Sequence, residues 1–306
     1  MKNKLFARLL MATAVASCAA PAMAGVVLTG DYLKIGINAG GSLIDFDSTP
    51  YVGIKYDPTG AGNFSSSNDF ITPGDPFAFY SIGVNGVSAV AGKGSSYNTF
   101  SATTVDASAG GPMAVSTGSF QNISFKQIIS FDVDSKIVHT SVIFTNKSGG
   151  ALTNVVYGVG FDPDQDVSFG GGYATYNSFG VSDSGANASV SAFGVKSGYT
   201  IALNNTTGWD SVKASISSGW QTNPYTLSST AFGAASTSDS TIALGFDLGN
   251  FAVGQQKTVG YDYVISSLAP LTPSGPGTLL PEPGTYTMLL AGLGLMGFMV
   301  RRRKSS

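Results

Sequence analysis

Alternation of apolar and polar residues with a period of two is frequent in the region 25–268, and helical spacing is absent there. Alternation of this kind is typical of strands that bury one face. Asn85-Gly86 is a strong two-residue hairpin signal, and 132–135 reads as a second turn. The clearest alternating segments are 33–37, 78–84, 123–131, 138–144, 155–161, 242–248 and 259–265. The pattern predicts an all-β body, with antiparallel sheets packed face to face as a β-sandwich.

The predicted domain organisation follows from changes in composition along the chain. The β-sandwich body occupies 25–268, as one large unit or as two sub-domains divided near 183–188. A linker rich in proline, glycine and serine follows at 269–280 and is expected to be extended. No short-period repeat is visible, so a solenoid is not expected.

The first 24 residues have the layout of a secretory signal peptide. Lysines and an arginine precede an apolar stretch, and Ala22-Met23-Ala24 forms a small-x-small cleavage pattern, which predicts cleavage after Ala24. The alternative is a lipoprotein-type site, because 15–18 ends in Cys18, which would then carry a lipid. If Cys18 is removed, the mature protein contains no cysteine and cannot form disulfides.

The C-terminus combines an uncharged apolar run at 285–300 with the basic cluster Arg301-Arg302-Arg303-Lys304. As a helix the run would reach roughly 24 Å, somewhat short of a hydrocarbon core of about 30 Å, a gap that flanking residues and local thinning can close. Cations directly after such a run favour the cytoplasmic side of a membrane. We therefore expect a single transmembrane helix rather than a core helix, since a core helix gains nothing from a basic end.

Together with Pro281-Glu282-Pro283, this arrangement resembles the PEP-CTERM sorting signal of Gram-negative bacteria, also catalogued as an ice-binding-protein C-terminal domain. The resemblance covers 281–304 and leaves the body unassigned. It implies passage through the export machinery, a transient inner-membrane anchor and processing by an exosortase. It also implies a final place at the cell surface or outside the cell, often in exopolysaccharide or biofilm. The body lacks the Thr-x-Thr ladders that an ice-binding face would need.

Charge in the body is strongly one-sided. It holds nine lysines and seventeen aspartates but no arginine or glutamate, so its net charge is −8, although the whole chain sums to −2. A body of this sign is not expected to bind nucleic acid through phosphate contacts, but it can attract divalent cations.

Asp162, Asp164 and Asp166 alternate at the end of one predicted strand, which allows a calcium loop, because carboxylates so spaced can converge on one ion. The loop is not an EF-hand: Val167 stands where glycine is needed, and Tyr173 where an acidic residue is needed. The alternative is a solvated turn in which aspartates cap backbone N–H groups.

Little else in the sequence suggests catalysis, and we expect no enzyme. His139 is the only histidine and lies in a predicted strand, without a Gly-x-Ser-x-Gly elbow elsewhere. No aspartate pair stands out for glycoside hydrolysis. Trp209 and Trp220 fill the core or, alternatively, stack against sugar rings at the surface.

Three functions remain open. The first is a structural or adhesive matrix protein held at the surface or secreted. The second is a carbohydrate-binding module with a calcium-stabilised loop, whose partner is a polysaccharide. The third is a polysaccharide hydrolase that uses aspartates.

Overall fold

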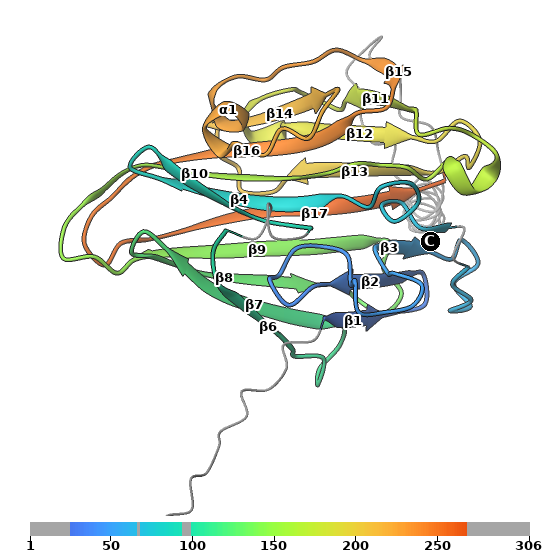
Figure 1. Cartoon of the computed structure of the whole chain (residues 1–306), viewed down its shortest axis with the longest axis horizontal. Helices are drawn as coiled ribbons and strands as arrows, with labels where there is room; N and C mark the ends of the chain where they lie inside the picture. The colour runs from blue at the N-terminus through green and yellow to red at the C-terminus, as the bar shows by residue number, and fades with distance from the viewer. Residues whose placement is uncertain (1–24, 66–67, 94–98, 268–306) are drawn as a thin grey trace, which may run out of the picture.

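The computed structural model describes residues 25–65, 68–93 and 99–267 (Figure 1). The predicted signal peptide with Ala22 and Ala24, the alternative lipid site Cys18, the linker 269–280 and the anchor segment 281–304 lie outside these residues. Within the described ranges, no helix is both long and apolar enough to cross a membrane.

The body is mostly β, as the alternation predicts, and its larger sheet has nine strands in the order β15-β11-β12-β13-β17-β9-β8-β7-β6. All neighbouring strands in it are antiparallel. The strands are β6 (Ala102–Asp106), β7 (Met113–Phe120), β8 (Ile123–Ser130), β9 (Ile137–Asn146), β11 (Thr175–Phe179), β12 (Ser189–Phe193), β13 (Thr200–Asn205), β15 (Ser236–Ser238) and β17 (Gln256–Ser266).

A second antiparallel sheet has five strands in the order β14-β16-β10-β4-β5. Its strands are β4 (Ala78–Val84), β5 (Val87–Ala91), β10 (Leu152–Phe161), β14 (Val212–Ser217) and β16 (Thr241–Phe251). The predicted hairpin at Asn85-Gly86 is confirmed: it joins β4 to β5, and both residues have positive φ, 53° and 84°. Positive φ at both central positions matches the twist of the flanking strands, which explains the Asn-Gly pair.

A small sheet of three strands, β1 (Val26–Thr29), β2 (Leu33–Ile37) and β3 (Ile54–Tyr56), packs beside the five-stranded sheet against the same core. The loop after β2 reaches polar side chains on the inner face of the nine-stranded sheet. Gln127 Nε2 donates to the Gly41 carbonyl at 2.7 Å, and Thr104 Oγ1 donates to the Ala39 carbonyl at 3.1 Å. These bonds satisfy buried polar groups that would otherwise be costly.

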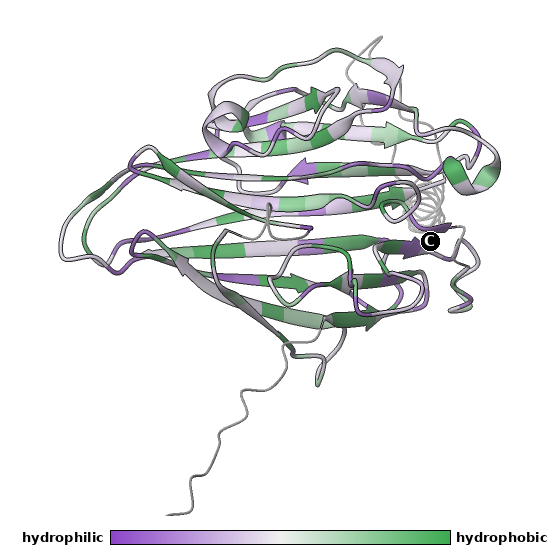
Figure 2. Ribbon diagram, viewed as in Figure 1, coloured by the Kyte–Doolittle hydropathy of each residue, from purple (hydrophilic) through white to green (hydrophobic). Residues whose placement is uncertain are grey.

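The two large sheets face each other across one hydrophobic core, so the predicted sandwich is confirmed. Hydrophobic and hydrophilic residues alternate along their strands (Figure 2). Tyr157 of β10 contacts Phe144 of β9, with ring centroids 5.4 Å apart, and its hydroxyl lies 3.1 Å from that of Tyr261 in β17. The alternating residues that the sequence placed on one face are indeed buried.

The strands β10 and β17 run in the same direction on opposite sides of this core. Tyr157 packs against Tyr261, and Phe161, further along β10, packs against Tyr263, further along β17. The ends of both strands therefore lie at the same end of the sandwich.

The described residues also contain short helices, although the alternation predicted a body without helices. The 3₁₀ helices are η3 (Val167–Phe169) and η4 (Gly185–Asn187), and the α-helix is α1 (Pro224–Ser229). The stretch 183–188 contains η4, and strands from before and after it occur in both large sheets. Its role as a boundary between sub-domains stays a prediction.

Helix α1 packs on the outer face of the five-stranded sheet, where glycines let its backbone approach. A Cβ on Gly158 of β10 would lie 2.8 Å from the Leu227 side chain, and one on Gly245 of β16 would lie 2.2 Å from the Leu227 carbonyl. Leu227 is buried there against Phe77, Phe79 and Ala243, with Trp220 packed at the side. The sheet thus has a second, smaller core outside the main one.

Replacing Gly245 with alanine is expected to lower the free energy of unfolding by about 1–3 kcal/mol, because overpacking would push α1 off the sheet. Denaturant titration followed by fluorescence measures the change. Gly149→Ala is the matched control, since a Cβ there meets nothing within 4 Å. A loss no larger than that of the control would show that α1 does not depend on this close approach.

Candidate functional site

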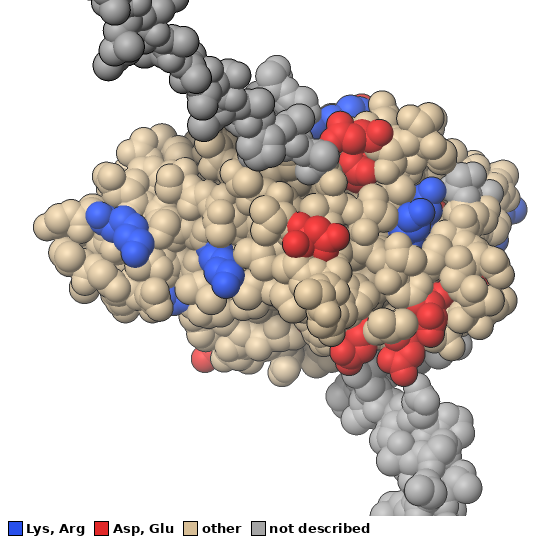
Figure 3. Space-filling view, turned by 90° about the horizontal axis from the view of Figure 1, so that it is seen from below, with Lys and Arg blue, Asp and Glu red and all other residues tan. Residues whose placement is uncertain are grey.

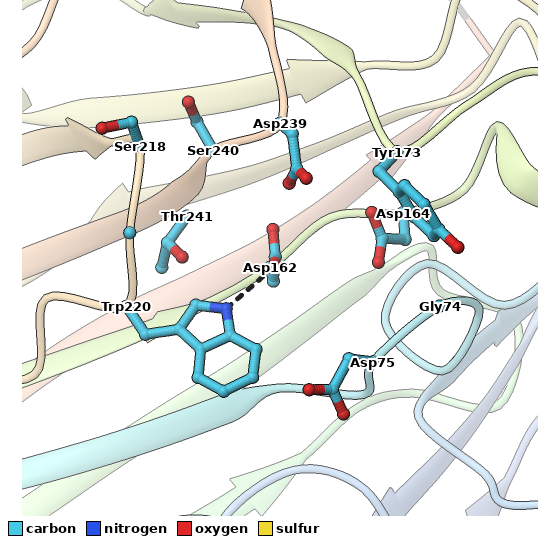
Figure 4. A pocket seen from close by; sticks show the side chains of 11 residues that line it. Gly74, Asp75, Asp162, Asp164, Tyr173, Ser218, Trp220, Asp239, Ser240 and Thr241 are labelled. Carbon is cyan, nitrogen blue, oxygen red and sulfur yellow. Dashed lines mark hydrogen bonds between the residues drawn. The ribbon is translucent and has the colours of Figure 1, made fainter.

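At one end of the five-stranded sheet, where its strands begin or stop, residues from distant parts of the chain come together. Neighbouring antiparallel strands run in opposite directions, so β10 and β14 end where β4 and β16 begin. Phe161 is the register partner of both Ala78 and Ile242, and Ser217 is the partner of Thr241. Beyond these positions lies a hollow of about 440 Å³ (Figure 4). It is lined by Gly74, Asp75, Asp162, Asp164, Tyr173, Ser218, Gly219, Trp220, Asp239, Ser240 and Thr241.

Three carboxylates meet in this hollow. One oxygen from each of Asp162, Asp164 and Asp239 lies within 4.8 Å of the others. Calcium binds its oxygens at 2.3–2.6 Å, so two oxygens on one ion are at most about 5 Å apart. Asp162 and Asp164 are buried, with 8% and 3% of their surface exposed, whereas Asp239 is exposed. The spacing fits a single divalent cation bound at the boundary between the sheet and solvent.

Polar atoms around the carboxylates are buried without partners. Asp162 Oδ1, Asp164 Oδ1 and the hydroxyl of Thr241, which is 2% exposed, have no hydrogen-bond partner among the described residues. A buried polar atom left unsatisfied costs about 1–3 kcal/mol, and more when it is charged. The hydroxyl is independent of the acidic cluster, and its residue, Thr241, lines the same hollow. Together these atoms could hold a metal ion, and their oxygen chemistry is that preferred by calcium.

The pKa values of the two buried aspartates, Asp162 and Asp164, are both raised. Burial raises the pKa of Asp164 to about 8, helped by the negative charges of Asp162, Asp239 and Asp75. Burial also raises the pKa of Asp162, while the hydrogen bond from Trp220 acts in the opposite direction. Without a cation these carboxyls favour their neutral forms at neutral pH, and a bound cation would favour the charged forms.

Trp220 forms a rigid aromatic wall of the hollow. Its ring stacks on Phe77 with centroids 4.2 Å apart and planes 6° from parallel. Its Nε1 donates to Asp162 Oδ2 at 3.0 Å, as the dashed line in Figure 4 marks. Because Phe77 belongs to the small core under α1, that core fixes the orientation of both the tryptophan and the aspartate.

Gly74 allows a loop to close over Asp164. Its φ is +76°, which L side chains rarely adopt. A Cβ at this position would lie 2.6 Å from Asp164 Oδ2 and 2.7 Å from the ring of Tyr173. Glycine is therefore required here for both conformation and space.

The structure brings together two of the three aspartates predicted to bind calcium. Asp166 instead accepts hydrogen bonds from the backbone N–H groups of Lys196 and Ser197, at 2.9 and 2.8 Å. It caps a turn, the alternative role that the sequence left open. Asp239 joins Asp162 and Asp164. The sequence around 162–166 contains no signal from which this third carboxylate could have been predicted.

The remaining sequence candidates lie elsewhere. His139 sits on the outer face of the nine-stranded sheet, where its Nδ1 lies 2.8 Å from Asp262 Oδ1, beside a separate hollow. Trp209 is half-buried and packs against the main core, away from the acidic hollow. Of the two tryptophans, only Trp220 lines that hollow.

Charged side chains are otherwise sparse: they make up 11% of the chain, and the face in Figure 3 shows them scattered among uncharged residues. Against that background, four aspartates on one hollow form an unusual concentration of negative charge.

The fold and the C-terminal segment together define an exported β-sandwich protein that is sorted by an exosortase. Residues 276–304 match the PEP-CTERM protein-sorting motif, which confirms the resemblance seen at Pro281-Glu282-Pro283 and the basic cluster Arg301-Arg302-Arg303. The motif leaves the body unassigned, and no curated protein matches the chain.

Among solved structures, the body is distantly similar to a putative aldose 1-epimerase from Escherichia coli K12, with 10% identity and a TM-score of 0.48 over 80% of this chain and 99% of that one. It is also similar to a bacterial glucoamylase complexed with acarbose (11% identity, TM-score 0.47, 82% of this chain) and to a polysaccharide lyase (13%, 0.39, 78%). This chain covers 32% and 33% of those two. Likenesses this distant carry no information about function.

Proposed function

We propose that this is a non-enzymatic carbohydrate-binding protein of the cell surface or extracellular matrix, and that its acidic hollow binds calcium. The observation that carries the proposal is the convergence of Asp162, Asp164 and Asp239 beside a buried hydroxyl without a partner. The sorting motif supports a role outside the cytoplasm, and an adhesive or structural place in exopolysaccharide or biofilm suits such a module.

The residues that line the hollow support carbohydrate as its ligand. Its walls combine aromatic rings, from Trp220 and Tyr173, with hydroxyls and carboxylates. Sugars present the matching surfaces, since the C–H face of a pyranose packs on an aromatic ring and its hydroxyls bond to oxygens. The volume of about 440 Å³ lies within the usual range of small-ligand pockets.

A second candidate is an aspartate-based hydrolase, because a pKa of about 8 would keep Asp164 protonated at neutral pH, as a general acid requires. The spacing favours the cation instead. One oxygen from each of three carboxylates lies within 4.8 Å of the others, which suits one shared cation, whereas glycosidases use a pair of carboxyls. Release of reducing ends from a polysaccharide, abolished by Asp164→Asn, would favour the hydrolase.

Glycan-array binding of the purified protein tests the proposal. Binding is expected in calcium and lost in EDTA. Trp220→Ala is expected to weaken it by at least about tenfold, since stacking and the orientation of Asp162 are both removed. Trp209→Ala is the matched control and is expected to keep binding, because Trp209 lies outside the hollow. Equal losses in the two variants, or binding unaffected by EDTA, would contradict the assignment.

A further inference from the structure

The acidic hollow leaves a bound cation incompletely coordinated by protein. Calcium takes 6–8 oxygen ligands, and one oxygen from each of the three carboxylates leaves at least about three positions open. Asp162 Oδ1 has no hydrogen-bond partner, whereas Oδ2 accepts the N–H of Trp220. Asp239 is exposed, so the cation would stand at the mouth of the hollow rather than below it. The open positions therefore face the space in which a ligand would bind.

The charge of the site selects against acidic ligands. Three carboxylates around a divalent cation carry a net charge of −1. Asp75 lies on the same hollow and is paired with Lys93. Among the described residues that line the hollow there is no lysine or arginine. A uronate, sulfate or phosphate would meet uncompensated negative charge, whereas a neutral polyhydroxyl compound would not.

The aromatic wall gives the ligand a fixed surface to pack on. Trp220 is immobilised by Phe77 and Asp162, so it loses little freedom when a ligand binds. Tyr173, 52% exposed, lies across the carboxylates from it (Figure 4). A flat ring with one apolar face fits between the cation and these aromatic groups.

We propose that the hollow binds a neutral saccharide through two adjacent hydroxyls, both of which coordinate the cation held by Asp162, Asp164 and Asp239. This deepens the proposed function and rests on it. The cation is then part of the binding surface and does more than stabilise the loop. Direct coordination couples the two ligands, and thermodynamic linkage requires the coupling to be reciprocal.

The test uses full-length protein in a sugar-free zwitterionic detergent and four polysaccharides. Internal residues of a 1,6-linked mannan and a 1,4-linked galactan carry adjacent hydroxyls. Those of a linear 1,3-linked glucan do not, and polygalacturonate carries them together with negative charge. Calcium affinity is measured by titration calorimetry with and without each neutral polymer. We expect mannan or galactan to tighten calcium binding by about tenfold and glucan to leave it unchanged. Polygalacturonate binds calcium on its own, so it is compared with the neutral polymers by capture on immobilised protein at one fixed concentration of free calcium, where it is expected to bind least.

Asp239→Asn is expected to abolish calcium and saccharide binding together, and because Asp239 is exposed the variant should fold. Asp134→Asn, an exposed aspartate in the turn between β8 and β9, is the control expected to keep both. A polysaccharide that binds in calcium, depends on Trp220 and leaves calcium affinity unchanged would overturn direct coordination while the proposed function stands. Tightest binding of polygalacturonate would do the same. Calcium binding without any glycan binding would overturn both.

Discussion

Calcium at about 10 mM is expected to raise the melting temperature of the protein by about 3–10 °C over its value in EDTA. Extracellular calcium modules bind with dissociation constants of about 10⁻⁴–10⁻³ M, so this concentration is a roughly tenfold to hundredfold excess and stabilises the folded state by about 1.4–2.7 kcal/mol. In a body of this size, each kcal/mol shifts the melting temperature by about 2–4 °C. Differential scanning calorimetry in the two buffers measures the shift.

Two variants show which aspartates hold the ion. Asp239→Asn is expected to lose the calcium-dependent shift, because it removes one of the three converging carboxylates. Asp166→Asn is expected to lower the melting temperature in both buffers and to keep the shift, because Asp166 holds backbone N–H groups instead. A shift that survives in Asp239→Asn and disappears in Asp166→Asn would restore the ligand set predicted from the sequence.

Without calcium, the free energy of unfolding is expected to fall as the pH rises from about 4.5 to 8, by up to about 1.4 kcal/mol per pH unit. The pKa of Asp164 is about 8 in the folded protein and about 3.9 in an unfolded chain. Between these values the folded state binds one more proton, so raising the pH removes stability. The raised pKa of Asp162 acts in the same direction. Urea titrations across this range in EDTA measure the slope.

Asp164→Asn isolates the effect, because an amide does not titrate. The variant is expected to show a flatter profile, to be more stable than the wild type at pH 8 in EDTA, and to gain nothing from calcium. Aspartates with lowered pKa values do not mask the effect. Asp57, for example, has a pKa of about 2, lowered mainly by its hydrogen bonds with Thr59, so it titrates below this range. Parallel pH profiles for wild type and variant would rule out Asp164 as the source.

The strands were predictable because a strand that buries one face has apolar residues at every second position. In β17, Val259, Tyr261, Tyr263 and Ile265 are all buried, as the alternation requires. The hairpin at Asn85-Gly86 was predictable for a different reason, since its positive φ angles demand those residue types. Both signals come from residues that are close in the sequence, so neither depends on knowing the rest of the topology.

Helix α1 left no comparable signal. It is six residues long, too short to show a period of 3.6. Its start is marked by Asn223, whose side chain accepts from the Tyr225 N–H, and by Pro224 at the first turn. A cap and a proline at N1 are helix signals, but without an apolar stripe they also suit a turn.

The third carboxylate of the hollow could not be read from local spacing. Asp239 precedes β16, and it meets Asp162 only because β16 runs antiparallel beside β10. Strand pairing between segments so far apart in the chain depends on the whole topology. The sequence did contain one clue to Asp239. The polar run Ser238-Asp239-Ser240 directly precedes an alternating strand, so it must lie at that end of the sheet whichever strands are its neighbours.

The shared direction of β10 and β17 also decides where a label can be attached. The last described strand ends at the same end of the sandwich where Asp162 leaves β10, because Phe161 packs against Tyr263. A bulky fusion joined directly after β17 would therefore crowd the mouth of the hollow, so a reporter for binding experiments belongs at the opposite end of the sandwich.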